Sequence, residues 1–230
     1  MGRRKAEIPR DPRGQRPGGA LEEAAVGANV PFWSGSFSFQ GKTYPYTMVG
    51  TDPSAGSVTS TIPVVIIPLK FVFFNGTTLS ASDPVCGGTA SAVTLTQASP
   101  LFEDFPFAPG GTDVGTTQYI DAFQRANFWN HVSTTSPDYH VLLSSTVQAT
   151  QTVVVPPVLG LTRKGPCAKI GQVNLIFFDQ LARGLIATLG IPPTSLFLTY
   201  NTFFTQGGCC ILGYHSATSG NQTYAVALVQ

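Results

Sequence analysis

The chain has 230 residues, of which 43% are hydrophobic and 11% charged, and its formal net charge is +1. This composition excludes a disordered polyampholyte, a collagen-like repeat and a strongly basic nucleic-acid-binding protein. The length is sufficient to bury one sizeable core, in one domain or in two small ones.

The N-terminal segment differs in composition from the rest of the chain. Ten of the 25 charged side chains lie in the first 23 residues, with several Pro and Gly and almost no apolar residue before Leu21. Such a segment cannot bury enough apolar surface to offset its ordering entropy, which predicts a disordered tail over residues 1–25. No apolar run of the kind that a secretory signal needs follows the first arginines. Residues 26–230 are predicted to form a single domain.

The first half of this domain is predicted to be rich in strands. Aromatic residues at alternate positions predict a β-hairpin over residues 31–50, with its turn at Gln40-Gly41-Lys42. Residues 62–74 are the most apolar stretch and predict a buried strand, too short and too interrupted to span a membrane. Residues 76–118, rich in Gly, Thr, Ser and Pro, predict a long irregular connection with a short helix near residues 97–102.

Two main helices are predicted in the second half. Apolar residues at three-residue steps predict the first helix over residues 116–132, with threonines at its start as N-cap candidates. The second helix is capped by Asn174 and ends at Gly190, before Pro192-Pro193.

The remaining segments predict further strands, which cover residues 139–145, 147–155, 195–204, 211–217 and 223–229, the last two as a hairpin. The order of strands and helices predicts an α+β fold rather than a regular βαβ wind. We expect a mixed, mainly antiparallel sheet with two main helices and long Gly/Thr/Ser/Pro-rich loops.

The cysteines indicate the compartment. Cys86, Cys167, Cys209 and Cys210 are compatible with two disulfides in an oxidising environment, and their spacing does not select among the three pairings. Because a vicinal disulfide strains its own peptide unit, we expect Cys209 and Cys210 to bond to different partners, or one cysteine to stay free. Together with the low Lys and Glu content, typical of exported bacterial β-proteins, this predicts an extracellular or periplasmic location.

The sequence contains no complete catalytic motif. His131 and His140 allow a zinc site with a third ligand, but lone histidines are more often structural and H-E-x-x-H is absent. Residues 213–217 resemble a nucleophile elbow only superficially, since the second glycine is missing and a strand places His215 and Ser216 on opposite faces. Calcium-binding and phosphate-binding spacings are also absent. No catalytic residue, metal ligand or cofactor is predicted in this chain, and nucleic acid is not a predicted partner.

Two segments carry a family resemblance. Residues 115–129, GTTQYIDAFQRANFW, and residues 208–217, GCCILGYHSA, resemble a group of uncharacterised exported bacterial proteins that are similar to zincin-type zinc metallopeptidases. The resemblance covers residues 32–230. In that group a helix with a His-Glu pair follows the point at which this chain ends, at Gln230. The resemblance therefore implies an N-terminal scaffold portion, incomplete at its C-terminus and without catalytic residues.

The resemblance also implies a place for substrate. The strand with Gly213, Tyr214, His215 and Ser216 would border a groove for an extended peptide or protein substrate in a longer form, and only that form would bind zinc. Our first hypothesis is thus an exported zincin-like scaffold that is inactive by itself.

Two other hypotheses stay open. One is a secreted β-rich carbohydrate- or protein-binding or adhesion module, which exposed coplanar aromatic rings would support and burial of Trp33, Phe37 and Trp129 would oppose. The other is a hydrolase that uses His131, His140 and an Asp, which requires those side chains to converge.

Overall fold

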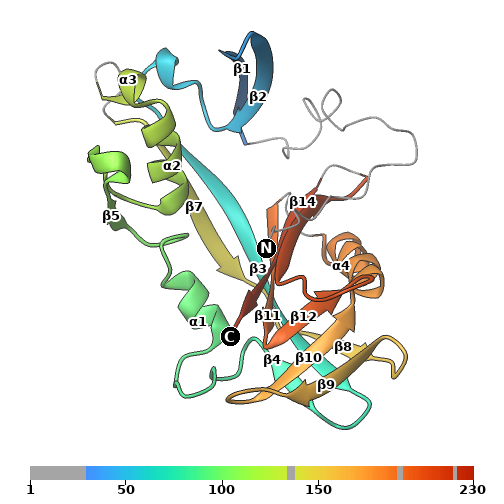
Figure 1. The fold of residues 1–230 in the computed structure, drawn as a ribbon. Helices are drawn as coiled ribbons and strands as arrows, with labels where there is room; N and C mark the ends of the chain where they lie inside the picture. Colours follow the sequence, from blue (N-terminus) through green and yellow to red (C-terminus); the bar gives the residue numbers. More distant parts are fainter. Residues whose placement is uncertain (1–29, 134–137, 191–193, 220–221) are drawn as a thin grey trace.

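A computed structural model describes residues 30–133, 138–190, 194–219 and 222–230. The predicted disordered tail lies outside these ranges. The described chain is mostly β with some helix, and its strands form mixed sheets around one long central strand, β3 (Thr59–Phe73) (Figure 1). β3 includes residues 62–73 of the apolar stretch predicted as a buried strand, so that prediction is confirmed except for Phe74, which is exposed in the following turn.

The largest sheet is built on β3. The path of paired strands runs β13-β14-β11-β3-β4, and β7 and β8 also pair with β3, one after the other along its length. The bounds are β4 (Thr78–Ser80), β7 (His140–Val147), β8 (Gln151–Val155), β11 (Thr194–Tyr200), β13 (Gly213–Ala217) and β14 (Thr223–Val229).

The prediction of a mainly antiparallel sheet is wrong for this sheet. β3 runs parallel to β7, β8 and β11, and β11 runs parallel to β14, so antiparallel pairing is left to β4 and β13 at its margins. Parallel neighbours need long crossover connections. The chain supplies them between β3 and β7, which encloses the helices α1, α2 and α3, and between β8 and β11, which encloses α4.

Three smaller sheets surround the large one. The first is the predicted hairpin of β1 (Phe32–Phe39) and β2 (Lys42–Val49), which is confirmed. The second has the order β12-β10-β9, and the third pairs β5 with β6. The bounds are β5 (Phe105–Phe107), β6 (Gly115–Thr117), β9 (Gly160–Lys164), β10 (Lys169–Asn174) and β12 (Thr202–Thr205). The strand predicted over residues 195–204 is divided into β11 and β12 at Asn201, which has a positive φ of 45°.

The second main helix is confirmed as α4 (Leu175–Leu189). The Asn174 side chain accepts a hydrogen bond from the Phe177 amide, and Gly190 ends the helix in the left-handed conformation. The first main helix is divided into α2 (Tyr119–Asn127) and α3 (Trp129–Val132). Its threonine N-caps are not used, because the preceding threonines belong to β6 and the cap residue is Gln118, without a side-chain cap.

The short helix in the irregular connection lies earlier than predicted. It is α1 (Ala92–Gln97), because the hydroxyl of Ser91 accepts a hydrogen bond from the Thr94 amide and so caps an earlier start. Two single 3-10 turns cover Pro53–Ala55 and Pro109–Gly111. In the described ranges, no helix has the length and apolar character needed to cross a membrane.

The core occupies both faces of the large sheet. On the face toward α4, Phe71, Phe197 and Phe204 pack around Phe178, whose ring stacks on that of Phe204 with centroids 4.4 Å apart. On the other face, Ile66 and Leu198 pack with residues of α1. A third cluster lies beneath α2 and α3 at the start of β3. α2, α3 and the β1–β2 hairpin lie at one end of β3, and β9 and β10 lie near its other end (Figure 1).

Candidate functional site

Half of the predicted substrate strand, β13, is engaged in packing. The Tyr214 hydroxyl donates to Asp179 Oδ1 at 3.2 Å, and Arg183 Nη2 donates to Ser216 Oγ at 3.0 Å. Arg183 Nε also donates to Asp179 Oδ2 at 2.7 Å. These contacts hold α4 on the β13–β14 hairpin, and Ser216 contributes to them as the acceptor of the hydrogen bond from Arg183.

The electrostatics of this cluster agree with a structural role. Burial would raise the pKa of the Asp179 carboxyl, but hydrogen bonds from Tyr224 and Arg183 outweigh this effect and hold the pKa below its ordinary value. Burial, together with the hydrogen bond to Asp179, raises the pKa of Tyr224 to about 12. Burial also raises the pKa of Tyr214. Both phenols therefore stay protonated as donors, and neither is activated as a base.

The other two predicted residues of this strand face the opposite side. Gly213 and His215 are exposed, as expected from alternation along a strand, and His215 is not placed to act as a base for Ser216. β13 is the last strand of its sheet in the described chain. In the register of the two strands, Gly213 lies opposite Ala227 and His215 lies opposite Ala225, and both alanines of β14 are half-buried.

The disulfide pairing departs from the expectation for adjacent cysteines. Cys86 is bonded to Cys167, with Cα atoms 6.0 Å apart, and Cys209 is bonded to Cys210. The expectation that Cys209 and Cys210 bond to different partners is wrong. The reason is topological: the fold brings the loops that hold Cys86 and Cys167 together, whereas Cys209 and Cys210 lie on the exposed loop after β12.

The histidines do not form a metal centre in the described chain. His140 Nδ1 lies 2.9 Å from Oδ2 of the fully buried Asp121. The side chain of His131 lies outside what the structure describes. Among the described residues, no three His, Cys, Asp or Glu side chains gather closely enough to hold a metal ion. Of the residues in the hydrolase hypothesis, the structure thus describes one histidine, His140, with a carboxylate beside it.

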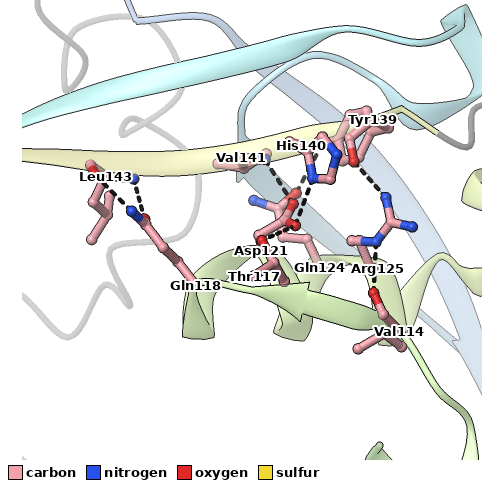
Figure 2. A network of polar contacts seen from close by, with 10 residues as sticks. All are labelled: Val114, Thr117, Gln118, Asp121, Gln124, Arg125, Tyr139, His140, Val141 and Leu143. Carbon is pink, nitrogen blue, oxygen red and sulfur yellow. Dashed lines mark hydrogen bonds and ion pairs between the residues drawn. The ribbon is translucent and has the colours of Figure 1, made fainter. Parts of the chain in front are cut away.

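Asp121 belongs to a polar network that closes the edge of the large sheet (Figure 2). Its carboxyl accepts hydrogen bonds from the Val141 amide at 2.8 Å and from Thr117 Oγ1 at 2.7 Å. Along α2, the Gln118 amide group pairs with both backbone groups of Leu143, and Arg125 Nη1 donates to the Tyr139 carbonyl at 2.6 Å.

This network explains the first of the two segments that carry the resemblance. Gln118 at the N-cap, and Asp121 and Arg125 of α2, lie on one face of the helix. The backbone groups of Val141 and Leu143 in β7 point toward this face. The helix thus supplies the partners that a further strand would have supplied, which protects the edge of the sheet from pairing with another chain. The segment QYIDAFQR therefore has a structural role that does not require catalysis.

The strongest candidate for a binding site is an aromatic groove. It has a volume of about 410 Å³ and is lined by Phe37, Tyr46 and Met48 of the hairpin and by Phe123, Asn127 and Phe128 of the α2–α3 region. Phe37 and Phe123 are 56% and 53% exposed, so the walls present ring surface to solvent. We call this surface the aromatic groove.

The rings of the groove are ordered by the hairpin register. Phe37 lies opposite Tyr44, and their rings are nearly parallel, with centroids 5.3 Å apart and an interplanar angle of 21°. Tyr46 lies across Gly35, where an added Cβ would be 2.7 Å from Tyr46 Cζ. The opposite face of the hairpin carries hydroxyls, as in the 3.0 Å contact between Ser34 Oγ and Thr47 Oγ1.

The sequence indicated only part of this groove. The alternation along the hairpin identified its aromatic face, and Phe37 is exposed, whereas Trp33 and Trp129 are half-buried. Phe123 belonged to a three-residue apolar spacing that suggested a buried helix face, yet it faces solvent because that spacing drifts around an α-helix. Searches against protein-family models, curated proteins and solved structures gave no match for this chain.

Proposed function

We propose that the protein is an exported carbohydrate-binding module and that the aromatic groove is its binding site. The observation that carries the proposal is the set of aromatic rings that line the groove from two elements, the exposed Phe37 and the half-buried Tyr46 from the hairpin and the exposed Phe123 from α2. The Cys86–Cys167 disulfide is compatible with an extracellular or periplasmic location.

The chemistry of the lining favours a neutral sugar. Among the residues that the structure describes, no Asp, Glu, Lys or Arg lines the groove, and the lining amide is Asn127, whose Nδ2 donates to the Phe123 carbonyl at 2.8 Å. The amide oxygen of Asn127 is left to accept from a ligand. A pyranose ring has an apolar C–H face that can lie on an aromatic ring and hydroxyls that can reach such an amide. The volume of about 410 Å³ lies within the range of small-ligand pockets.

The test is a binding titration with neutral oligosaccharides of glucose and of N-acetylglucosamine. We expect Phe37→Ala and Tyr46→Ala each to weaken binding at least about tenfold, because a few aromatic side chains at the centre of a site carry most of the binding energy. Gly35→Ala should weaken it as well, since the new methyl group would displace the Tyr46 ring. Isothermal titration calorimetry measures the affinities, and circular dichroism checks the fold of each variant.

The matched control is Phe74→Ala, which removes a 62% exposed ring just after β3, away from the groove. Its affinity should equal that of the native protein. Absence of binding to both oligosaccharide series, or equal losses in Phe37→Ala and Phe74→Ala, would contradict the proposal. Pull-down of a defined protein partner that depends on Phe37, with no sugar binding, would favour the protein-binding alternative instead.

The zincin-like scaffold is a second proposal, supported by the position of β13 at a sheet edge. Leu228 N donates to the Leu212 carbonyl and Thr218 N to the Gln222 carbonyl. By antiparallel alternation, the backbone groups of His215 then face away from β14, where an extended peptide could pair. This proposal predicts that the purified chain holds no stoichiometric zinc and cleaves no peptide. Elemental analysis and a peptidase assay test it, and tight zinc binding with peptide cleavage would refute it.

A further inference from the structure

The cations of the described chain are concentrated at one place. After the first 23 residues the sequence has seven Lys and Arg, and three of them, Arg163, Lys164 and Lys169, lie on the β9–β10 hairpin. Lys164 and Lys169 are directly opposite each other in the register of the two strands. Like charges in this position destabilise a strand pair, so the hairpin carries a local electrostatic cost.

These cations border a hollow with fixed walls. The hollow has a volume of about 620 Å³, and its lining includes Asn75, the three cations and Cys167. Cys167 forms a disulfide bond with Cys86, which follows β4. The Asn75 side chain is held at both ends, because Nδ2 donates to Thr162 Oγ1 at 2.8 Å and Oδ1 accepts from the Thr77 amide at 3.1 Å. We call this site the cationic hollow.

The charges are available to a ligand. Lys169 Nζ donates to Thr77 Oγ1 at 2.9 Å, which orients the ammonium group and leaves two of its three protons unused. Within the described ranges, no carboxylate lies within ion-pair distance of Arg163, Lys164 or Lys169. Asp83 lines a neighbouring hollow that shares Lys169, but it does not line this one.

We infer that the cationic hollow binds a sulfate or phosphate group. A doubly charged oxyanion would neutralise the Lys164–Lys169 pair, and the guanidinium of Arg163 can donate two parallel hydrogen bonds to such a group. The site is separate from the aromatic groove, because its hairpin β9–β10 lies toward one end of β3, whereas the β1–β2 hairpin and α2 lie toward the other end (Figure 1).

The experiment measures the melting temperature of the full chain in sodium sulfate or sodium phosphate, against sodium chloride at equal ionic strength. We expect a saturable rise of about 3–5 °C at a ligand concentration ten times the Kd. In Lys164→Gln/Lys169→Gln the rise should disappear, while the melting temperature without oxyanion should be equal to or above that of the native chain, because the repulsion is removed.

Two further variants test whether the rise in melting temperature comes from the cationic hollow. Lys42→Gln, which removes an exposed lysine at the start of β2, should keep the full response. Phe37→Ala should also keep it, so failure of the sugar proposal leaves this one testable. A sulfated tetrasaccharide that binds more tightly than free sulfate would identify an anionic polysaccharide as the source of the group. A response equal to that of chloride, or one that persists in the double variant, would overturn the inference.

Discussion

Removal of the Cys86–Cys167 disulfide should lower the free energy of unfolding by about 4–5 kcal/mol. The bond joins cysteines 81 positions apart in the sequence, and so it closes a long loop in the unfolded chain. Closing a loop of that length removes about 4–5 kcal/mol of conformational entropy, expressed as TΔS, from the unfolded state. The bond ties the segment after β4 to the turn between β9 and β10.

The measurement is urea unfolding of Cys86→Ser/Cys167→Ser beside the native protein under non-reducing conditions. The matched control is Cys209→Ser/Cys210→Ser, which removes a bond between neighbours in the sequence. Because that bond closes no loop of significant length, its loss should cost about 1 kcal/mol or less. Equal losses in the two double variants would show that loop closure is not the source of the stabilisation.

Asp121→Ala should destabilise the protein by about 3–5 kcal/mol, the usual cost of removing one partner from a buried, hydrogen-bonded network. The carboxyl is fully buried and joins β6, α2 and β7 through Thr117, His140 and the Val141 amide. An alanine leaves the Val141 amide and the Thr117 hydroxyl without an acceptor and also leaves a cavity. Chemical denaturation, followed by circular dichroism, measures the change.

Two comparisons give this prediction its specificity. Asp104→Ala removes an exposed carboxyl from the loop before β5 and should change stability by no more than about 0.5 kcal/mol. Asp121→Asn keeps an acceptor for the Val141 amide and should cost less than the alanine variant. If Asp121→Ala unfolds at the same denaturant concentration as the native chain, the network does not hold α2 on the edge of the sheet.

The same network bears on the aromatic groove. Phe123 and Asn127 stand on α2, which Asp121 and its neighbours fasten to β7. A partial release of α2 would move one wall of the groove relative to the hairpin. If the groove is the binding site, Asp121→Asn should therefore bind sugar more weakly than the native protein while the variant is still folded.

Local patterns allowed several elements to be predicted. The β1–β2 hairpin follows from alternation around a glycine turn, and α4 follows from Asn174 and Gly190, because caps and turns depend on residues close in sequence. The pair β9 and β10 was not predicted, since Gly, Lys and Arg give no apolar alternation there. α1 starts earlier than predicted because Ser91 provides its cap.

The sequence by itself determined the β-rich composition, the amphipathic hairpin, the ends of α4 and the presence of enough cysteines for two disulfides. Only the tertiary structure decided that the sheet around β3 is largely parallel, that Cys86 pairs with Cys167 and that Phe123 faces solvent beside Phe37. The physical reason is that these features depend on contacts between segments far apart in the chain. A strand or an aromatic side chain has the same local preference whichever distant neighbour finally covers it.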